Sequence, residues 1–133
     1  MTTRDSQLLR QFEAIEIEGD SFRHRQHVEV AFEMLDKYSF LEACQKYSNV
    51  INTMAIRGGA ADKFNVTITF AFLSIIAERK AQMPNADLDT FLSANSDLLD
   101  KELLKGWYSD ERLRSVDARR HFLLPDKPGA HAA

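Results

Sequence analysis

Two histidines, His24 and His27, offer the clearest chemistry in this chain of 133 residues. On a helix they would lie one turn apart, so both rings could reach the same point in space. A neutral imidazole acts as a general base or as a metal ligand. A second polar group follows later in the chain, and its members are Lys63, Asn65, Thr67 and Thr69. We expect His24, His27 and Lys63 to be catalytic, and the amide and the two hydroxyls to bind a ligand, provided that the fold brings the two groups together.

The elements that must position these residues are helices. The segment DKFNVTITFAFLSIIAERK is apolar on nearly every side, which is typical of a helix buried by neighbours on all faces. We therefore predict an all-α protein, a single compact bundle of about six helices around a central helix over about 62–81. Asp62 is the expected N-cap of that helix, which should end before Pro84. The residues VTITF favour a strand when taken alone, but the length and the boundaries of the run favour a helix.

The other helices are shorter or more amphipathic. Helical spacing predicts helices over 4–16 and 22–37, a third from the cap Ser39 to Gly58, and short elements after Asn85. Ser109 should cap a last helix. We expect residues 1–126 to form one helical domain and residues 127–133 to form a loose tail.

Short connections between the helices over 22–37, 40–57 and 62–81 predict that they alternate in direction. The first and third would then begin at the same end of the bundle, which brings the histidines toward Lys63. Two helix N-termini favour an anion and disfavour protonated histidines. The sequence therefore predicts a polar pocket that binds or transforms a small anionic metabolite, and it leaves open whether the protein is an enzyme.

Two alternatives stand beside this prediction. His24 and His27 could bind a divalent metal, but zinc needs a third ligand, for which His121 and Glu78 are the candidates. The protein could instead be a helical interaction module or a homodimer without catalysis, joined through exposed apolar side chains around Trp107. Each polar residue also has a structural interpretation, because histidines pack in cores and helical threonines bond back to the preceding turn.

Composition narrows the class of protein. The net charge of −3 argues against a nucleic-acid partner. The longest apolar segment, 64–77, is interrupted by polar residues and is too short to span a bilayer, so we expect no membrane association. The N-terminus lacks the pattern of a signal peptide, and the single Cys44 cannot form an internal disulfide. These features predict a soluble cytoplasmic protein with Cys44 buried.

Three segments carry a resemblance: FRHRQHVEVAFEML, DKFNVTITFAFL and YSDERLRSVDARRHFLLPD. They resemble a family of small bacterial helical proteins with the motifs F-x-H-x-x-H-V, K-x-x-x-T-x-T and A-R-x-x-F-x-x-P-D, and the likeness covers most of residues 12–126. The resemblance implies no particular reaction. It implies that eight positions recur: Phe22, His24, His27, Lys63, Thr67, Thr69, Arg119 and Asp126. The roles of Arg119, Arg120 and His121 are left open by the sequence.

Overall fold

The computed structural model describes residues 5–18 and 21–127, and every regular element within them is helical. This confirms the all-α prediction; residues 4 and 128–133, which belong to the predicted first helix and loose tail, lie outside the described residues. No helix in the described ranges is long and apolar enough to cross a membrane. The α-helices are α1 (Gln7–Glu13), α2 (His24–Lys37), α3 (Phe40–Arg57), α4 (Val66–Gln82), α5 (Leu88–Ala94), α6 (Asp110–Arg114) and α7 (Val116–Arg120). The 3-10 turns are η2 (Ala61–Lys63), η3 (Ser96–Leu99) and η4 (Leu103–Gly106).

The central helix α4 begins three residues later than the predicted cap requires. Asn65 is its N-cap: the side-chain oxygen accepts a hydrogen bond from the N–H of Ile68 at 2.9 Å. Asp62 lies instead in the 3-10 turn η2, which Phe64 and Asn65 separate from α4 with extended backbone. An Asn at this position is as good a cap as an Asp, so the prediction of Asp62 was wrong. The helix ends at Gln82, before Pro84 as expected.

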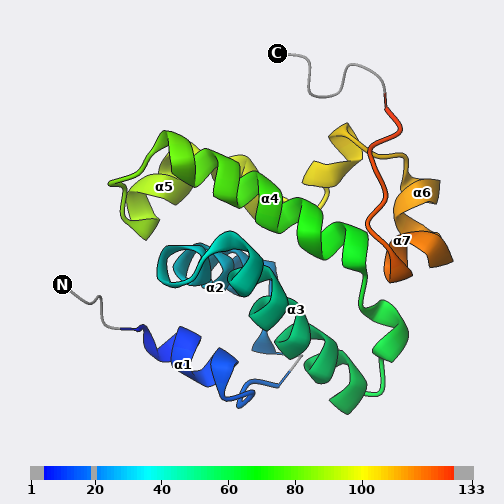
Figure 1. Cartoon of the computed structure of the whole chain (residues 1–133), viewed down its shortest axis with the longest axis horizontal. Helices are drawn as coiled ribbons and strands as arrows, with labels where there is room; N and C mark the ends of the chain where they lie inside the picture. The colour runs from blue at the N-terminus through cyan, green and yellow to red at the C-terminus, as the bar shows by residue number, and fades with distance from the viewer. Residues whose placement is uncertain (1–4, 19–20, 128–133) are drawn as a thin grey trace.

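Figure 1 shows α4 lying across the molecule, with α2 and α3 against one side and α7 near its first turn. Its buried residues are Thr67, Ala71, Leu73 and Ile76. Within residues 66–78 of α4, only Ser74 and Glu78 are exposed. Most of the circumference of the helix is therefore covered. The long apolar run is therefore a helix packed on several faces, as its composition predicts.

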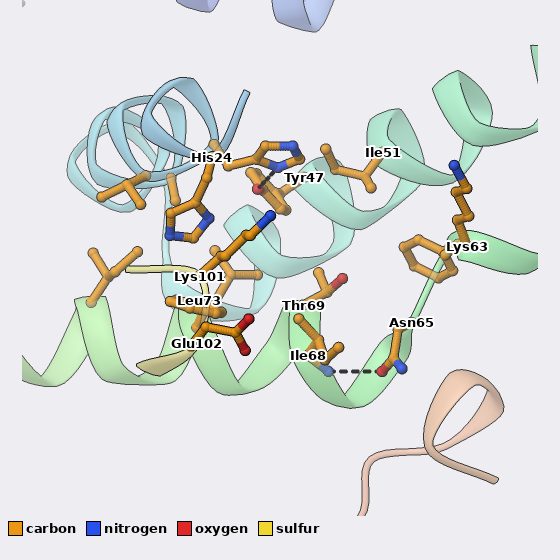
Figure 2. Close-up of a pocket in the computed structure, with 16 residues that line it drawn as sticks. His24, Tyr47, Ile51, Lys63, Asn65, Ile68, Thr69, Leu73, Lys101 and Glu102 are labelled. Atoms are coloured by element: carbon orange, nitrogen blue, oxygen red, sulfur yellow. Dashed lines mark hydrogen bonds between the residues drawn. The ribbon is translucent and has the colours of Figure 1, made fainter. Parts of the chain in front are cut away.

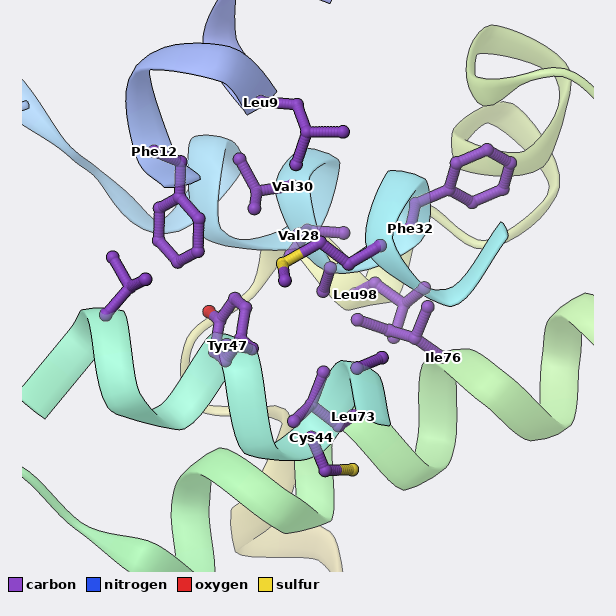
Figure 3. Close-up of a cluster of buried hydrophobic side chains, with 14 of the residues drawn as sticks. Leu9, Phe12, Val28, Val30, Phe32, Cys44, Tyr47, Leu73, Ile76 and Leu98 are labelled. Atoms are coloured by element: carbon purple, nitrogen blue, oxygen red, sulfur yellow. The ribbon is translucent and has the colours of Figure 1, made fainter. Parts of the chain in front are cut away.

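Helix α2 is as deeply buried as α4, and this was not predicted. Val30 is fully buried and Phe32 is 5% exposed, although both lie outside the apolar stripe that contains the histidines. Leu9 of α1 and Phe91 of α5 belong to the same hydrophobic core, and the rings of Phe32 and Phe91 are 4.9 Å apart. Figure 3 shows Leu9 of α1 beside Val30 of α2 in this core. Two short helices thus cover a face of α2 that the sequence pattern leaves unassigned.

Helices α2 and α4 run in the same sense, as the predicted alternation requires: His24 at the start of α2 lies against Phe72, and Asp36 near its end pairs with Lys80 near the end of α4. In Figure 1, α4 extends across the view while α2 is foreshortened, so the two helices cross at an angle. The ring of His24, the first residue of α2, lies 5.1 Å from the ring of Phe72, which is in the second turn of α4. The start of α2 therefore lies over the body of α4 and not beside its N-terminus. Short loops restrict the distance between helices, but side-chain packing sets their crossing angle.

The single helix expected after Ser109 is two helices. Ser109 caps α6, accepting from the N–H of Arg112, and Ser115 interrupts the run with extended backbone. The Ser115 side chain accepts from the N–H of Ala118 and so begins α7. A second internal cap therefore divides the predicted helix.

We call residues 121–127 the C-terminal segment. It contains no helix, yet side chains from other elements hold it. The Thr67 hydroxyl donates to the carbonyl of His121 at 2.6 Å and accepts from the N–H of Leu123 at 3.1 Å. The Tyr108 hydroxyl donates to the carbonyl of Leu123 at 2.8 Å. The segment is thereby fixed against the first turn of α4.

The end of this segment is also held. Asp126 accepts hydrogen bonds from the N–H and the hydroxyl of Ser109, both at 2.7 Å. The N–H of Lys127 donates to the carbonyl of Trp107 at 3.1 Å. Lys127, expected as the first residue of a loose tail, is therefore an anchored residue.

Candidate functional site

A cavity of about 410 Å³ lies between α2, α3, α4 and the turn that joins η3 to η4. Its size is within the range of small-molecule sites. Its polar lining residues are His24, His27, Tyr47, Lys63, Asn65, Thr69, Lys101 and Glu102. Apolar side chains form the rest of the wall, among them Ile51, Phe72, Leu73 and Ile76. Figure 2 shows the cavity with side chains entering it from all of these elements.

Five of the six residues proposed from the sequence line this cavity, and Thr67 does not. Thr67 is fully buried on another side of α4, with its hydroxyl bonded to the C-terminal segment. Residues that are two positions apart in a helix are separated by about 200° around its axis, so the side chains of Thr67 and Thr69 face nearly opposite directions. The expectation that both hydroxyls bind one ligand is therefore wrong for Thr67.

His24 is held by the backbone and presents one nitrogen to the cavity. Its Nε2 lies 2.8 Å from the carbonyl oxygen of Leu98, and because a carbonyl only accepts, Nε2 carries the hydrogen. In the neutral ring Nδ1 is then a hydrogen-bond acceptor. No described residue pairs with Nδ1, and every fully buried side-chain nitrogen or oxygen in the described ranges has a partner. Nδ1 is therefore accessible, and in Figure 2 the ring projects from α2 into the cavity.

His27 is committed to a structural hydrogen bond. Its Nδ1 lies 2.9 Å from the hydroxyl of Tyr47, and burial raises the pKa of Tyr47, so this hydroxyl stays protonated. Burial lowers the pKa of His27 to about 4, with a further contribution from His24 and opposition from the Phe22 backbone. The histidine is neutral at pH 7 as expected, but burial is the main cause and not a helix dipole.

Asn65 and Thr69 differ in what they can offer a ligand. The amide of Asn65 is used on both sides, since its oxygen caps α4 and its nitrogen donates to the carbonyl of Leu113 at 2.8 Å. The hydroxyl of Thr69 has no partner among the described residues, whereas Thr53 of α3 bonds back to the carbonyl of Asn49 at 2.8 Å. By the same reasoning as for His24, the Thr69 hydroxyl is accessible.

Lysines give the cavity a positive rim. The lysines that form ion pairs in the described chain are Lys37, Lys80 and Lys105, so Lys63 and Lys101 keep their charges for other partners. The Glu102 carboxylate pairs with Lys105 at 2.8 Å. In Figure 2 the amine of Lys101 points toward the side where His24 and Tyr47 lie, while Lys63 stands beyond Ile51.

Sequence reasoning missed Lys101, and it paired Lys63 with the histidines instead. Lys101 lies between Asp100 and Glu102 in a short turn, where a lysine normally indicates only solvated surface. The hydrogen bond between Leu98 and His24 and the burial of Leu98 and Leu104 fix this turn over the cavity. No sequence signal reports a contact between positions so far apart.

A metal site finds no support in the described residues. No three His, Cys, Asp or Glu side chains there come close enough to hold an ion. The two candidates for a third ligand, His121 and Glu78, are exposed and do not line the cavity. The histidine pair thus lacks the further ligand that zinc requires.

Trp107 belongs to a second hydrophobic cluster with Tyr108, Leu104 and Leu113, as a packing residue. Cys44 is buried as predicted. The exposed apolar side chains after Trp107 are Val116, Phe122 and Leu124, and a homodimer through this region stays a prediction.

Searches against protein-family models, curated proteins and solved structures found no match to this chain.

Proposed function

We propose that this protein binds a small organic anion in the cavity between α2, α3 and α4. The observation that carries the proposal is that three uncommitted polar groups line one cavity together with an apolar wall. These groups are Nδ1 of His24, the hydroxyl of Thr69 and the amine of Lys101. Polar groups that serve only the fold normally have a hydrogen-bond partner within the protein. Here Asn65 bonds to the carbonyl of Leu113, and His27 bonds to the hydroxyl of Tyr47.

The charges favour an anion over a cation. Lys63 and Lys101 line the cavity, and the single carboxylate in its lining, Glu102, is already paired with Lys105. The carboxylate of Asp100 accepts from the N–H of Glu102 at 2.9 Å and lies outside the lining. A ligand carboxylate entering the cavity loses hydration, and the lysines at the rim offset that cost.

His24 is the residue placed to exchange a proton with the bound ligand. The carbonyl of Leu98 fixes its tautomer and orientation, in the way that an orienting group holds a general base. Binding is the function that the site supports best, and proton transfer at Nδ1 is the chemistry that the same geometry would serve.

A thermal-shift assay tests the proposal. Hexanoate, benzoate and 3-phenylpropanoate are added at pH 8, with the corresponding neutral amides as controls. At ten times Kd a ligand stabilises the folded state by about 1.4 kcal/mol, which raises the melting temperature by roughly 5 °C. We expect this rise with at least one of the acids and not with its amide.

Variants locate the binding. Lys101→Ala should weaken the shift while leaving the melting temperature of the unliganded protein unchanged, because the Lys101 side chain forms no ion pair in the described chain. Lys46→Ala, at an exposed position of α3 outside the cavity, is the matched control. Equal shifts with acids and amides, or an undiminished shift in a Lys63→Ala/Lys101→Ala double variant, would contradict anion binding at this site.

A further inference from the structure

We infer that the ligand is a hydroxy acid with an apolar chain: a carboxylate, a hydroxyl group close to it, and an aromatic or branched hydrocarbon remainder. This inference rests on the proposed function and adds the class of acid. It is argued from two parts of the cavity that differ in chemistry. One is the polar part at His24, and the other is the apolar wall formed by α3 and α4.

The hydroxyl group follows from His24. With Nε2 donating to the carbonyl of Leu98, Nδ1 of the neutral ring accepts a hydrogen bond and cannot donate one. A simple carboxylate has only hydrogen-bond acceptors, so it cannot form a hydrogen bond with this acceptor atom. A ligand O–H satisfies it, whereas an acceptor left unpaired on binding costs free energy.

The position of the hydroxyl follows from Lys101 and Thr69. The amine of Lys101 points toward the His24 side of the cavity, and the Thr69 side chain rises from α4 into it (Figure 2). Both groups donate to a carboxylate. Because the Lys101 amine lies on the His24 side of the cavity in Figure 2, a carboxylate bound by Lys101 and a hydroxyl bound by Nδ1 lie close together, as in a 2-hydroxy acid.

An ammonium group in place of the hydroxyl is disfavoured. It would also donate to Nδ1, but it would enter a cavity lined by two lysines, where Glu102 is already paired with Lys105. Like charges that close together repel. The site therefore selects hydroxy acids over the corresponding amino acids.

The apolar remainder follows from the wall. Ile51, Phe72 and Ile76 face the cavity, and Phe72 also contacts the His24 ring edge-on at 5.1 Å between centroids. A volume of about 410 Å³ accommodates an aromatic acid, and a two- or three-carbon acid would leave the wall in contact with water.

Isothermal titration at pH 8 with four probes tests the inference: 3-phenyllactate, 3-phenylpropanoate, lactate and phenylalanine. We expect 3-phenyllactate to bind about threefold to tenfold more tightly than 3-phenylpropanoate, which corresponds to one additional hydrogen bond. Lactate and phenylalanine should each bind at least tenfold more weakly than 3-phenyllactate. In His24→Leu the preference for the hydroxyl should vanish while 3-phenylpropanoate still binds.

Because His24→Leu also removes the bond to Leu98 and could impair folding, a second measurement uses the unmodified protein. The 15N resonance of His24 Nδ1 should shift on adding 3-phenyllactate and much less on adding 3-phenylpropanoate. If neither aromatic acid binds, the proposed function fails together with this inference. If both bind within twofold of each other and the resonance is unmoved, or if phenylalanine binds as tightly as 3-phenyllactate, this inference alone is overturned.

Discussion

His27 should make the folded protein sensitive to acid. Its pKa in the folded state is about 4, against 6.5 for an unperturbed histidine. Between these values the unfolded chain binds a proton that the folded chain does not. The free energy of unfolding therefore falls as the pH falls through this window, and the contribution of His27 is fully present only above it.

The size of the effect follows from the two pKa values. Between pH 8 and pH 5 the loss is about 2 kcal/mol, and below pH 4 it reaches roughly 3 kcal/mol. In His27→Asn the side-chain oxygen can still accept a hydrogen bond from the Tyr47 hydroxyl, but the side chain at position 27 no longer binds a proton. This variant should be less stable than the wild type at pH 8 because the ring packs against Phe22 at 4.3 Å between centroids. Its further loss between pH 8 and pH 5 should be smaller than that of the wild type by about 2 kcal/mol.

Urea unfolding at pH 8 and pH 5, followed by the fluorescence of the single tryptophan, measures this difference. Other titrating groups cancel when the pH dependence of the variant is subtracted from that of the wild type. His121→Asn is the control for replacing an exposed histidine with asparagine. If His27→Asn loses as much stability on acidification as the wild type, His27 is not buried in its neutral form and the reasoning fails.

Three further predictions concern stability, each checked by urea unfolding at pH 8. Thr67→Val should cost about 2 kcal/mol, because the carbonyl of His121 and the N–H of Leu123 lose their partner; Thr69→Val should cost less than half as much, and equal costs would refute the contrast. Asn65→Ala should cost about 1–2 kcal/mol through loss of the cap and of the bond to Leu113, with Asn65→Asp intermediate, since it keeps only the cap. Phe91→Ala should cost about 3–4 kcal/mol because Phe91 is fully buried against Phe32; a cost under 1 kcal/mol would mean that α5 does not cover α2.

The parts of the fold that the sequence predicted are those with local signals. The apolar run of α4, the cap Ser39 and the boundary at Pro84 each act within a few residues, and the structure contains the helices that they predict. The cap of α4 was placed wrongly because Asp62 and Asn65 are both good capping residues. Only the tertiary bond from Asn65 to Leu113 adds a reason to prefer the second.

Only part of the candidate site could be predicted, namely the residues that share one face of a single predicted helix. His24 and Lys63 line one cavity, and in Figure 2 Lys101 lies on the His24 side of it while Lys63 lies beyond Ile51. Lys101 reaches the cavity because Leu98 of η3 is buried in the core and its carbonyl bonds to His24, and no local pattern reports these contacts. Of the eight positions predicted to recur, Thr67, Arg119 and Asp126 bond to Leu123, Asp62 and Ser109 respectively, so their contacts here are structural.

The turn that carries Lys101 and Glu102 has a consequence for how this protein could diversify. The long helices that supply the walls are fixed by the core, so few substitutions there would be tolerated. The turn between η3 and η4 contributes side chains to the cavity from exposed positions 100–102, while the flanking Leu98 and Leu103 pack on the core. Descendants of this chain could therefore change the charge of their preferred ligand by substitutions at positions 100–102, with the helical scaffold inherited intact.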